Sequence, residues 1–283
     1  MELYGGKYYN PNLYTDLATE RRRAMPSAEG VEYRVNESPG GTWESVKILT
    51  EKAAREIGRP IGRYDTLNTG RLDTLTDEEL DDAQEEIAKK LCLMLDELGV
   101  SPERLLVVGL GNPRLTPDSV GPKTTMRVRA TKHISDADRQ AFLALECSEI
   151  SVISPGVAID SGMEAFDIIK SICTGLNPDA VIAVDSIISH SEERLGTTFQ
   201  LSNTGICPGS GIGNAKRSIS ESTLGIPVFA IGVPTVIDSR VFQRHPTGGE
   251  SSMLVSPREI DEITDSAARV IGGAVNQAFG IYF

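Results

Sequence analysis

Apolar positions along the chain form short continuous runs that are typical of buried strands. Residues 105–110 are too few for a buried helix, and the run breaks at Gly109, Gly111, Asn112 and Pro113. This pattern predicts a buried strand that leads into a loop carrying Asp118. Residues 180–184 form a second such run, which ends directly on Asp185.

Helical periodicity is clearest in three other segments. Residues 76–98 open with a capping-box pattern at Thr76 and Glu79 and continue with apolar residues at helical spacing. Residues 162–174 place their apolar side chains on roughly one side. Residues 256–278 read as an N-capped helix that starts at Ser256-Pro257.

Further segments complete an alternation of strands and helices. We expect strands at residues 31–35, 43–49, 150–153, 197–201 and 227–231, helices at 50–57 and 121–130, and a turn or edge segment at 59–64. A strand, a helix and a strand in succession form the right-handed crossover unit of a parallel sheet. The sequence therefore predicts an α/β fold with a mostly parallel central sheet flanked by helices.

The two predicted strand ends carry the candidate chemistry. In an open parallel sheet the ligand crevice forms at the carboxyl ends of the strands, so Asp118 and Asp185 would face one site if their strands are neighbours. Taken singly, Asp118 is explained by a helix N-cap and Asp185 by bonds to backbone amides. A close pair is more informative, because one carboxyl is pushed to hold a proton while the other acts as a base on water. That pairing suits amide hydrolysis.

Length, charge and cysteine usage narrow the class of protein. The 283 residues suffice for one large α/β domain, and the net charge of -12 argues against nucleic acid as the main partner. No apolar run reaches membrane-spanning length, and the first ten residues lack the features of a signal peptide. These features predict a cytoplasmic protein. Its four cysteines show no CxxC spacing, so we expect free thiols.

Other site chemistries fit less well. The glycine clusters do not match a dinucleotide fingerprint, because Arg114 stands where a third glycine is needed and residues 209–213 have the wrong spacing. The three histidines lie in unrelated segments without metal-ligand spacing, so no cofactor and no metal are expected. The motif VGLGNP resembles the opening of peptidyl-tRNA hydrolase, but that likeness stops there. A thiol nucleophile, Cys207 with His190, stays open.

Residues 15–20, TDLATE, allow two interpretations. The ordinary one is a helix start, with Thr15 or Asp16 as the N-cap and Glu20 in the first turn. The other is a cleavage site, because an acidic residue is followed by an apolar one, a small one and a second acid.

Six motifs in the same order carry a resemblance to a known family. They are TDLATE at 15–20, VGLGNPRLTPDSVGP at 108–122, ISPGVAIDSGMEAFDIIK at 153–170, PDAVIAVDS at 178–186, TGICPGSGIGN at 204–214 and TLGIPVFAIGVPTVID at 223–238. Together they resemble the germination protease (spore protease) of spore-forming bacteria. Two departures are Asn203, where an aspartate is expected, and a short segment at 240–253.

The resemblance implies a function, a site and an organisation. It implies an endopeptidase that starts the degradation of small acid-soluble spore proteins, works in the spore core, and has a fold similar to that of the hydrogenase-maturation proteases. The catalytic aspartates would be Asp118 and Asp185. The zymogen would cut itself between Asp16 and Leu17, leaving a pro-segment at 1–16 and a single endopeptidase domain at 17–283. The assembly would be a homotetramer, without nucleic acid or membrane as a partner.

One alternative from a different class is kept. The chain could be a non-proteolytic binding protein, or another amidohydrolase, on the same fold.

Overall fold

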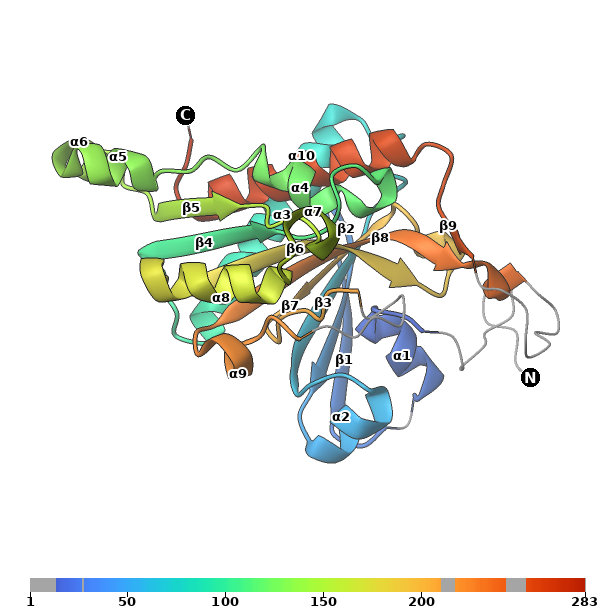
Figure 1. Cartoon of the computed structure of the whole chain (residues 1–283). Helices are drawn as coiled ribbons and strands as arrows, with labels where there is room; N and C mark the ends of the chain where they lie inside the picture. Colours follow the sequence, from blue (N-terminus) through green and yellow to red (C-terminus); the bar gives the residue numbers. More distant parts are fainter. Residues whose placement is uncertain (1–13, 27, 210–216, 243–252, 283) are drawn as a thin grey trace.

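A computed structural model describes residues 14–26, 28–209, 217–242 and 253–282 (Figure 1). Most of the expected pro-segment, the centre of the glycine-rich loop and most of the short segment at 240–253 lie outside these residues. Within the described part, all strands join one nine-stranded sheet in the order β1-β2-β3-β7-β8-β6-β4-β5, with β9 against β8.

The half of the sheet that holds the expected site is parallel. β4 pairs with β5 and β6, and β6 pairs with β8, all in the same direction. These strands are β4 (Arg104–Gly109), β5 (Glu149–Ile153), β6 (Ala180–Ser189) and β8 (Val228–Asp238). The apolar runs of β4, β6 and β8 are buried on both faces, as is typical of parallel strands inside a sheet, whereas β5 lies at the edge and is only partly buried. The predicted α/β class is confirmed, but the sheet is mixed, and the prediction of parallel strands holds only for this half.

The other half of the sheet is antiparallel. It consists of β1 (Val31–Ser38), β2 (Gly41–Ile48), β3 (Gly62–Asn68) and β7 (Thr198–Ser202), and β9 (Leu254–Val255) adds a short edge to β8. The interpretation of 59–64 as a turn or edge segment is wrong from Gly62 onward, because β3 lies between β2 and β7. Charged residues usually indicate an exposed segment, but here Asp65 is fully buried and accepts a 2.6 Å bond from Arg63 Nε.

Helices cover the sheet in three groups, which can be followed in Figure 1. Long helices α3 (Asp77–Glu97) and α10 (Ile260–Ala278) pack on one face with α4 (Val120–Thr125), and α8 (Ala165–Leu176) and α9 (Glu221–Leu224) pack on the other. Helices α1 (Ala18–Ala24) and α2 (Glu51–Ile57) lie against the antiparallel half. None of the described helices is long and apolar enough to cross a bilayer.

Short elements fill the connections. They are the helices α5 (Lys132–Ala137), α6 (Arg139–Leu143) and α7 (Ala158–Ser161) and the 3₁₀ turns η1 (Thr116–Asp118), η2 (Glu192–Arg194) and η4 (Ser239–Phe242).

Helix starts follow the local capping chemistry where it is complete. The capping box is present in full at the start of α3: the Thr76 hydroxyl accepts from the Glu79 amide, and the Glu79 carboxylate accepts from the Thr76 amide. The expected start of the last helix at Ser256 is wrong, because α10 begins at Ile260 after Glu259, with no side-chain cap. A helix without a capping side chain has no local signal that marks its first residue.

Two strands are longer than their apolar runs. β6 continues past Val184 to Ser189, and β8 continues beside it to Asp238. The reason is mutual pairing, since Asp185 lies opposite Gly232 and the ladder runs on to Ser189. Asp185 is therefore inside β6 and not at its end. Only relative to β4, whose pairing stops at Gly109 opposite Val184, does Asp185 mark a strand end.

A glycine contact brings α4 onto the end of β4. A Cβ at Gly109 would stand 2.2 Å from the Gly121 carbonyl oxygen, and a Cβ at Gly121 would stand 2.2 Å from that of Leu110. Both partners are backbone atoms, which cannot move aside as a flexible side chain can. The close approach of α4 to β4 therefore requires both glycines.

We predict that Gly109→Ala destabilises the chain by about 3 kcal/mol, because the added methyl must push α4 away from the sheet. Urea unfolding followed by circular dichroism measures the change. The matched control is Gly175→Ala in α8, where nothing lies within 4 Å of the added Cβ. That variant should gain about 0.5 kcal/mol from helix propensity. Equal unfolding midpoints for the two variants would contradict the packing argument.

Candidate active site

The loop after β4 returns Asp118 toward the neighbouring strand. β4 and β6 are direct parallel neighbours, and η1, which ends at Asp118, packs against β6 and β8. The Asp118 carboxylate accepts a 2.9 Å bond from the Asn112 amide. Gly111 has φ +112°, and a Cβ there would stand 2.1 Å from the Asp118 carbonyl oxygen. The loop can fold back on itself only because residue 111 is glycine.

Asp185 shares one row of the sheet with Gln200. Asp185 on β6 lies opposite Gly232 on β8, and Gly232 lies opposite Gln200 on β7. Side chains at directly opposed positions point to the same face of a sheet, and two strand spacings separate the two residues by about 10 Å. Gly232 has no side chain, and the Ile187 side chain occupies the space above it, since a Cβ at Gly232 would stand 2.8 Å from Ile187. Asp185 and Gln200 therefore lie on either side of this packed position.

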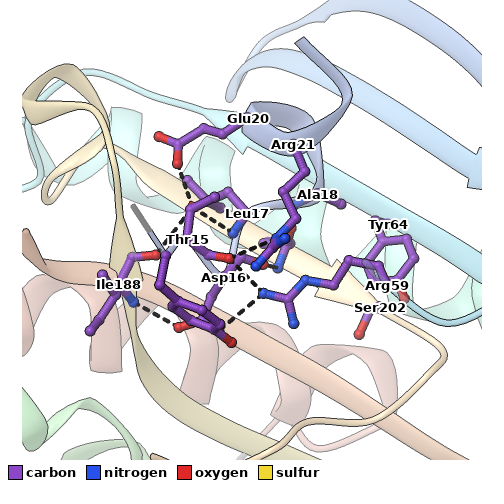
Figure 2. Close-up of polar contacts among 12 residues, drawn as sticks. Thr15, Asp16, Leu17, Ala18, Glu20, Arg21, Arg59, Tyr64, Ile188 and Ser202 are labelled. Atoms are coloured by element: carbon purple, nitrogen blue, oxygen red, sulfur yellow. Dashed lines mark hydrogen bonds and ion pairs between the residues drawn. The ribbon is translucent and has the colours of Figure 1, made fainter. Parts of the chain in front are cut away.

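The segment containing Asp16 and Leu17 is attached to these same strands (Figure 2). The Asp16 amide donates to the Ile188 carbonyl at 2.9 Å, and the Ile188 amide donates to the Asp16 carboxylate at 3.0 Å. Gln200 spans the next peptide: its Nε2 donates to the Asp16 carbonyl at 3.1 Å, and its Oε1 accepts from the Ala18 amide at 2.7 Å. The Asp16–Leu17 bond thus lies between β6 and the side chain of Gln200.

The helix-cap interpretation of residues 15–20 is wrong in its cap residue. α1 begins at Ala18 after Leu17, and no side chain caps it. Glu20 is in the first turn, as expected. Leu17 is fully buried, so the segment is bound by its apolar side chain as well as by its polar groups.

Arg59 is the site residue that the sequence pattern missed. Its Nη2 donates to the Asp16 carboxylate at 3.1 Å and to the Thr15 carbonyl at 2.8 Å. Burial alone would lower the pKa of the Arg59 guanidinium, but the Asp16 carboxylate raises it overall, so the charge is kept. Arg59 stands in the turn before β3, and nothing local signals a partner that is distant in sequence.

Glu20 joins α1 to the end of β6. Its buried carboxylate accepts bonds from Ser189 Oγ at 2.6 Å, from the His190 amide at 2.9 Å and from the Ser191 amide at 3.2 Å, and the Thr15 hydroxyl also donates to it. These bonds satisfy the buried carboxylate oxygens at the end of β6. They also hold the strand that carries Asp185 against the segment that carries Asp16.

The electrostatic surroundings disfavour the thiol alternative. Burial, together with the Asp16 carboxylate, raises the pKa of the Cys207 thiol, and burial is the main cause that lowers the pKa of the His190 imidazole. A protonated thiol is a weak nucleophile. Elsewhere in the described part of the chain, no group of three or more His, Cys, Asp or Glu side chains is arranged to hold a metal ion.

Glu44 anchors the other end of α1. Its carboxylate, on β2, accepts bonds from Arg194 at 2.5 Å and from Arg23 at 3.0 Å, and Tyr33 and Asn68 also donate to it. Burial by itself would raise the pKa of Glu44, but Arg194 and the other donors lower it to about 2. Helix α1 is therefore bound at its start by Glu20 and at its last turn by Arg23.

Asn203 has a structural role that explains one departure from the expected motif. Its side-chain oxygen accepts a 2.8 Å bond from the Arg63 amide at the start of β3. The amide side chain thus fixes the end of β7 against β3.

Similarity to known proteins identifies the family of this chain. The family model described as germination protease matches residues 12–247. The chain belongs to the germination protease family. It is 40% identical over 231 residues to the germination protease of Caldanaerobacter subterraneus, covering 80% of this chain and 70% of that one. It is 33% identical over 315 residues to that of Clostridium perfringens, covering 94% and 95%.

Two further similar proteins are another germination protease and a protease of known structure. The germination protease of Bacillus cereus is 40% identical over 237 residues, which are 81% of this chain and 64% of that one. Among solved structures, the [NiFe] hydrogenase maturation protease HycI from Thermococcus kodakarensis is 16% identical with a TM-score of 0.38, covering 64% of this chain and 98% of that one. Membership of the germination protease family makes the chain an endopeptidase, and the non-proteolytic alternative is not retained.

We predict that Glu44→Gln costs about 3 kcal/mol of unfolding free energy near neutral pH, because the lowered pKa of Glu44 reports that much stabilisation of its ionised form. The pKa is lowered in the folded state, so this contribution is present above about pH 4.5 and is lost as the pH falls toward 2. The difference between wild type and variant should therefore shrink across that window.

Urea unfolding at several pH values tests this. The exposed Glu78→Gln in α3 is the control, and its cost should be small at every pH. A Glu44→Gln cost that stays constant from pH 7 to pH 3 would refute the assignment.

Proposed function

We propose that Asp118 and Asp185 are the catalytic pair of this protease. One carboxylate takes a proton from water as the water attacks the carbonyl carbon, and the other carboxyl gives a proton to the leaving nitrogen. The observation that supports this most strongly is the row Asp185–Gly232–Gln200, because Gln200 donates to the carbonyl of the Asp16–Leu17 bond. The same donor is suited to the negative charge that develops on that oxygen.

The second part of the proposal is that the chain is made as a zymogen and cuts itself between Asp16 and Leu17. The uncut segment supports this, since it is bound through Ile188, Gln200 and Arg59 on the strands and turn around Asp185. A segment in that position blocks access of other peptides. Its removal would leave the proposed mature domain, residues 17–283, with α1 still anchored through Glu20 and Arg23.

The third part of the proposal concerns the substrate, the compartment and the assembly. We propose that the substrates are small acid-soluble spore proteins, that the enzyme acts in the spore core, and that it assembles as a homotetramer. Membership of the germination protease family supports the protein substrate, and the proposal includes no cofactor, metal, nucleic acid or membrane.

Asp118→Asn and Asp185→Asn should each lower the rate of proteolysis by about 10²- to 10⁴-fold, and the double variant should be little worse than either, because the two groups act as one unit. Cleavage of a small acid-soluble spore protein is followed by electrophoresis, and circular dichroism checks the fold.

Two controls accompany this measurement. Asp136→Asn, on the surface helix α5, should keep full activity, and so should Cys207→Ser. Near wild-type turnover in either catalytic variant would exclude the pair, and loss of activity in Cys207→Ser would favour the thiol alternative.

We also expect self-cleavage to speed up as the pH falls below neutrality, since a pair of carboxylates must share protons to act as acid and base. Mass spectrometry of the N-terminus after mild acidification should detect a chain that starts at Leu17, and that species should be missing in Asp185→Asn. An intact Met1, or a cut elsewhere, would contradict the assigned bond.

A further inference from the structure

The Asp16 side chain occupies a pocket built by the body of the protein. Its carboxylate is bound by Arg59 Nη2 at 3.1 Å and by the Ile188 amide at 3.0 Å, and the Tyr14 hydroxyl adds a 2.7 Å bond from the segment itself. Both charged side chains are largely buried, with 16% of Arg59 and 13% of Asp16 exposed. Arg59 and Ile188 belong to parts of the chain that would remain after cleavage at Asp16–Leu17.

Backbone hydrogen bonds fix the position of Arg59. Arg59 follows the left-handed end of α2 at Gly58, and its amide donates to the Ala54 carbonyl at 3.1 Å. The turn in which it lies ends where Tyr64 donates to the Pro60 carbonyl at 2.9 Å. Figure 2 shows the Arg59 side chain reaching from the side of Tyr64 and Ser202 to Asp16. A side chain that is already held in its binding conformation loses little conformational entropy when a ligand binds.

The positive charge of Arg59 favours binding of another anion once residues 1–16 are removed. Arg59 is permanently charged, and a buried guanidinium without a counter-charge is strongly unfavourable. The guanidinium also has donor capacity beyond Asp16, because its Nε is buried and bonds to no other described residue. After removal of residues 1–16, the acidic side chain of a second peptide would supply the carboxylate that Asp16 supplied to Arg59.

Backbone contacts tie this pocket to one particular peptide bond. Arg59 Nη2 donates to the carbonyl of Thr15, before Asp16, while Gln200 donates to the carbonyl of Asp16 itself and accepts from the amide of Ala18. The residue whose side chain meets Arg59 is therefore the residue whose following peptide bond lies at Gln200, in the row of Asp185. Side-chain recognition and bond position are coupled through the same two residues.

From these contacts we infer that Arg59 is the specificity-determining residue that selects an acidic residue on the amino side of the cleaved bond. In the uncut chain Asp16 fills its pocket, and in the mature enzyme the substrate's acidic side chain replaces Asp16. The inference rests on the proposed function, because it takes the site around Asp185 as the place of cleavage.

The probe is the blocked heptapeptide Tyr-Thr-Asp-Leu-Ala-Thr-Glu, which copies residues 14–20, and its analogue with Asn in place of Asp. Each enzyme is released from the full chain by a site-specific protease whose recognition sequence replaces residues 11–16, so release does not depend on self-cleavage. Binding is measured by fluorescence polarisation in an Asp118→Asn background, and kcat/KM in the active background.

The wild-type site should prefer the acidic peptide by about 10- to 100-fold in both measurements, as expected for a charge-assisted hydrogen bond in a buried site. In Arg59→Met the preference should fall to about 1, with the loss confined to the acidic peptide. Arg59→Lys should keep part of the preference, since it keeps the charge but loses the guanidinium Nη2 that binds both the carboxylate and the preceding carbonyl.

Arg55→Met is the matched control, because Arg55 is exposed one turn earlier on α2. It should keep the wild-type preference. The inference is overturned if wild type binds both peptides equally, or if Arg59→Met keeps the wild-type preference. Selective binding of the acidic peptide without any cleavage would leave the role of Arg59 supported and would refute the proposed catalytic function instead.

Discussion

The extension of β6 past the end of β4 is the constraint on which the site depends. The two strands are parallel partners up to Val184, and then the chain after β4 turns away through glycines while β6 continues beside β8. From that point β6 carries Asp185 on a face of the sheet and offers the backbone of Ile188 to another segment. The segment that takes this position is the one around Asp16.

Buried carboxylates organise the N-terminal part of the chain, and each is stabilised in a different way. Asp16 is paired with Arg59, Glu44 with Arg194 and Arg23, and Glu20 with hydroxyls and backbone amides at the end of β6. Burial makes such partners necessary, since a buried carboxylate without hydrogen-bond donors or a counter-charge would be costly. These contacts cross the Asp16–Leu17 bond. Arg59 binds Asp16 and the Thr15 carbonyl, whereas Glu20 binds both Thr15 and the end of β6.

Local patterns predicted the elements whose residues are apolar or carry a complete cap. The runs at 105–110 and 180–184 are strands, and the helix at 76–98 starts at its capping box. Prediction failed where charged residues lie inside the sheet. Residues 59–64 are predicted as a turn or edge segment, but from Gly62 onward they belong to β3, where Arg63 bonds to Asp65 between β2 and β7. The extension of β6 beyond Val184 was missed because it depends on pairing with β8, which no local pattern contains.

The sequence by itself determined the α/β class, the family and the two aspartates as candidates, because these depend on contiguous residues whose order along the chain is enough to identify them. The tertiary structure decided that Asp185 lies within a strand, that Gln200 stands in its row, and that Arg59 binds Asp16. These relations depend on strand register and on the packing of segments far apart in sequence. The alternation within one strand fixes which of its faces is buried, but the partner strand, which lies far away in the sequence, is chosen only when the strands pack together.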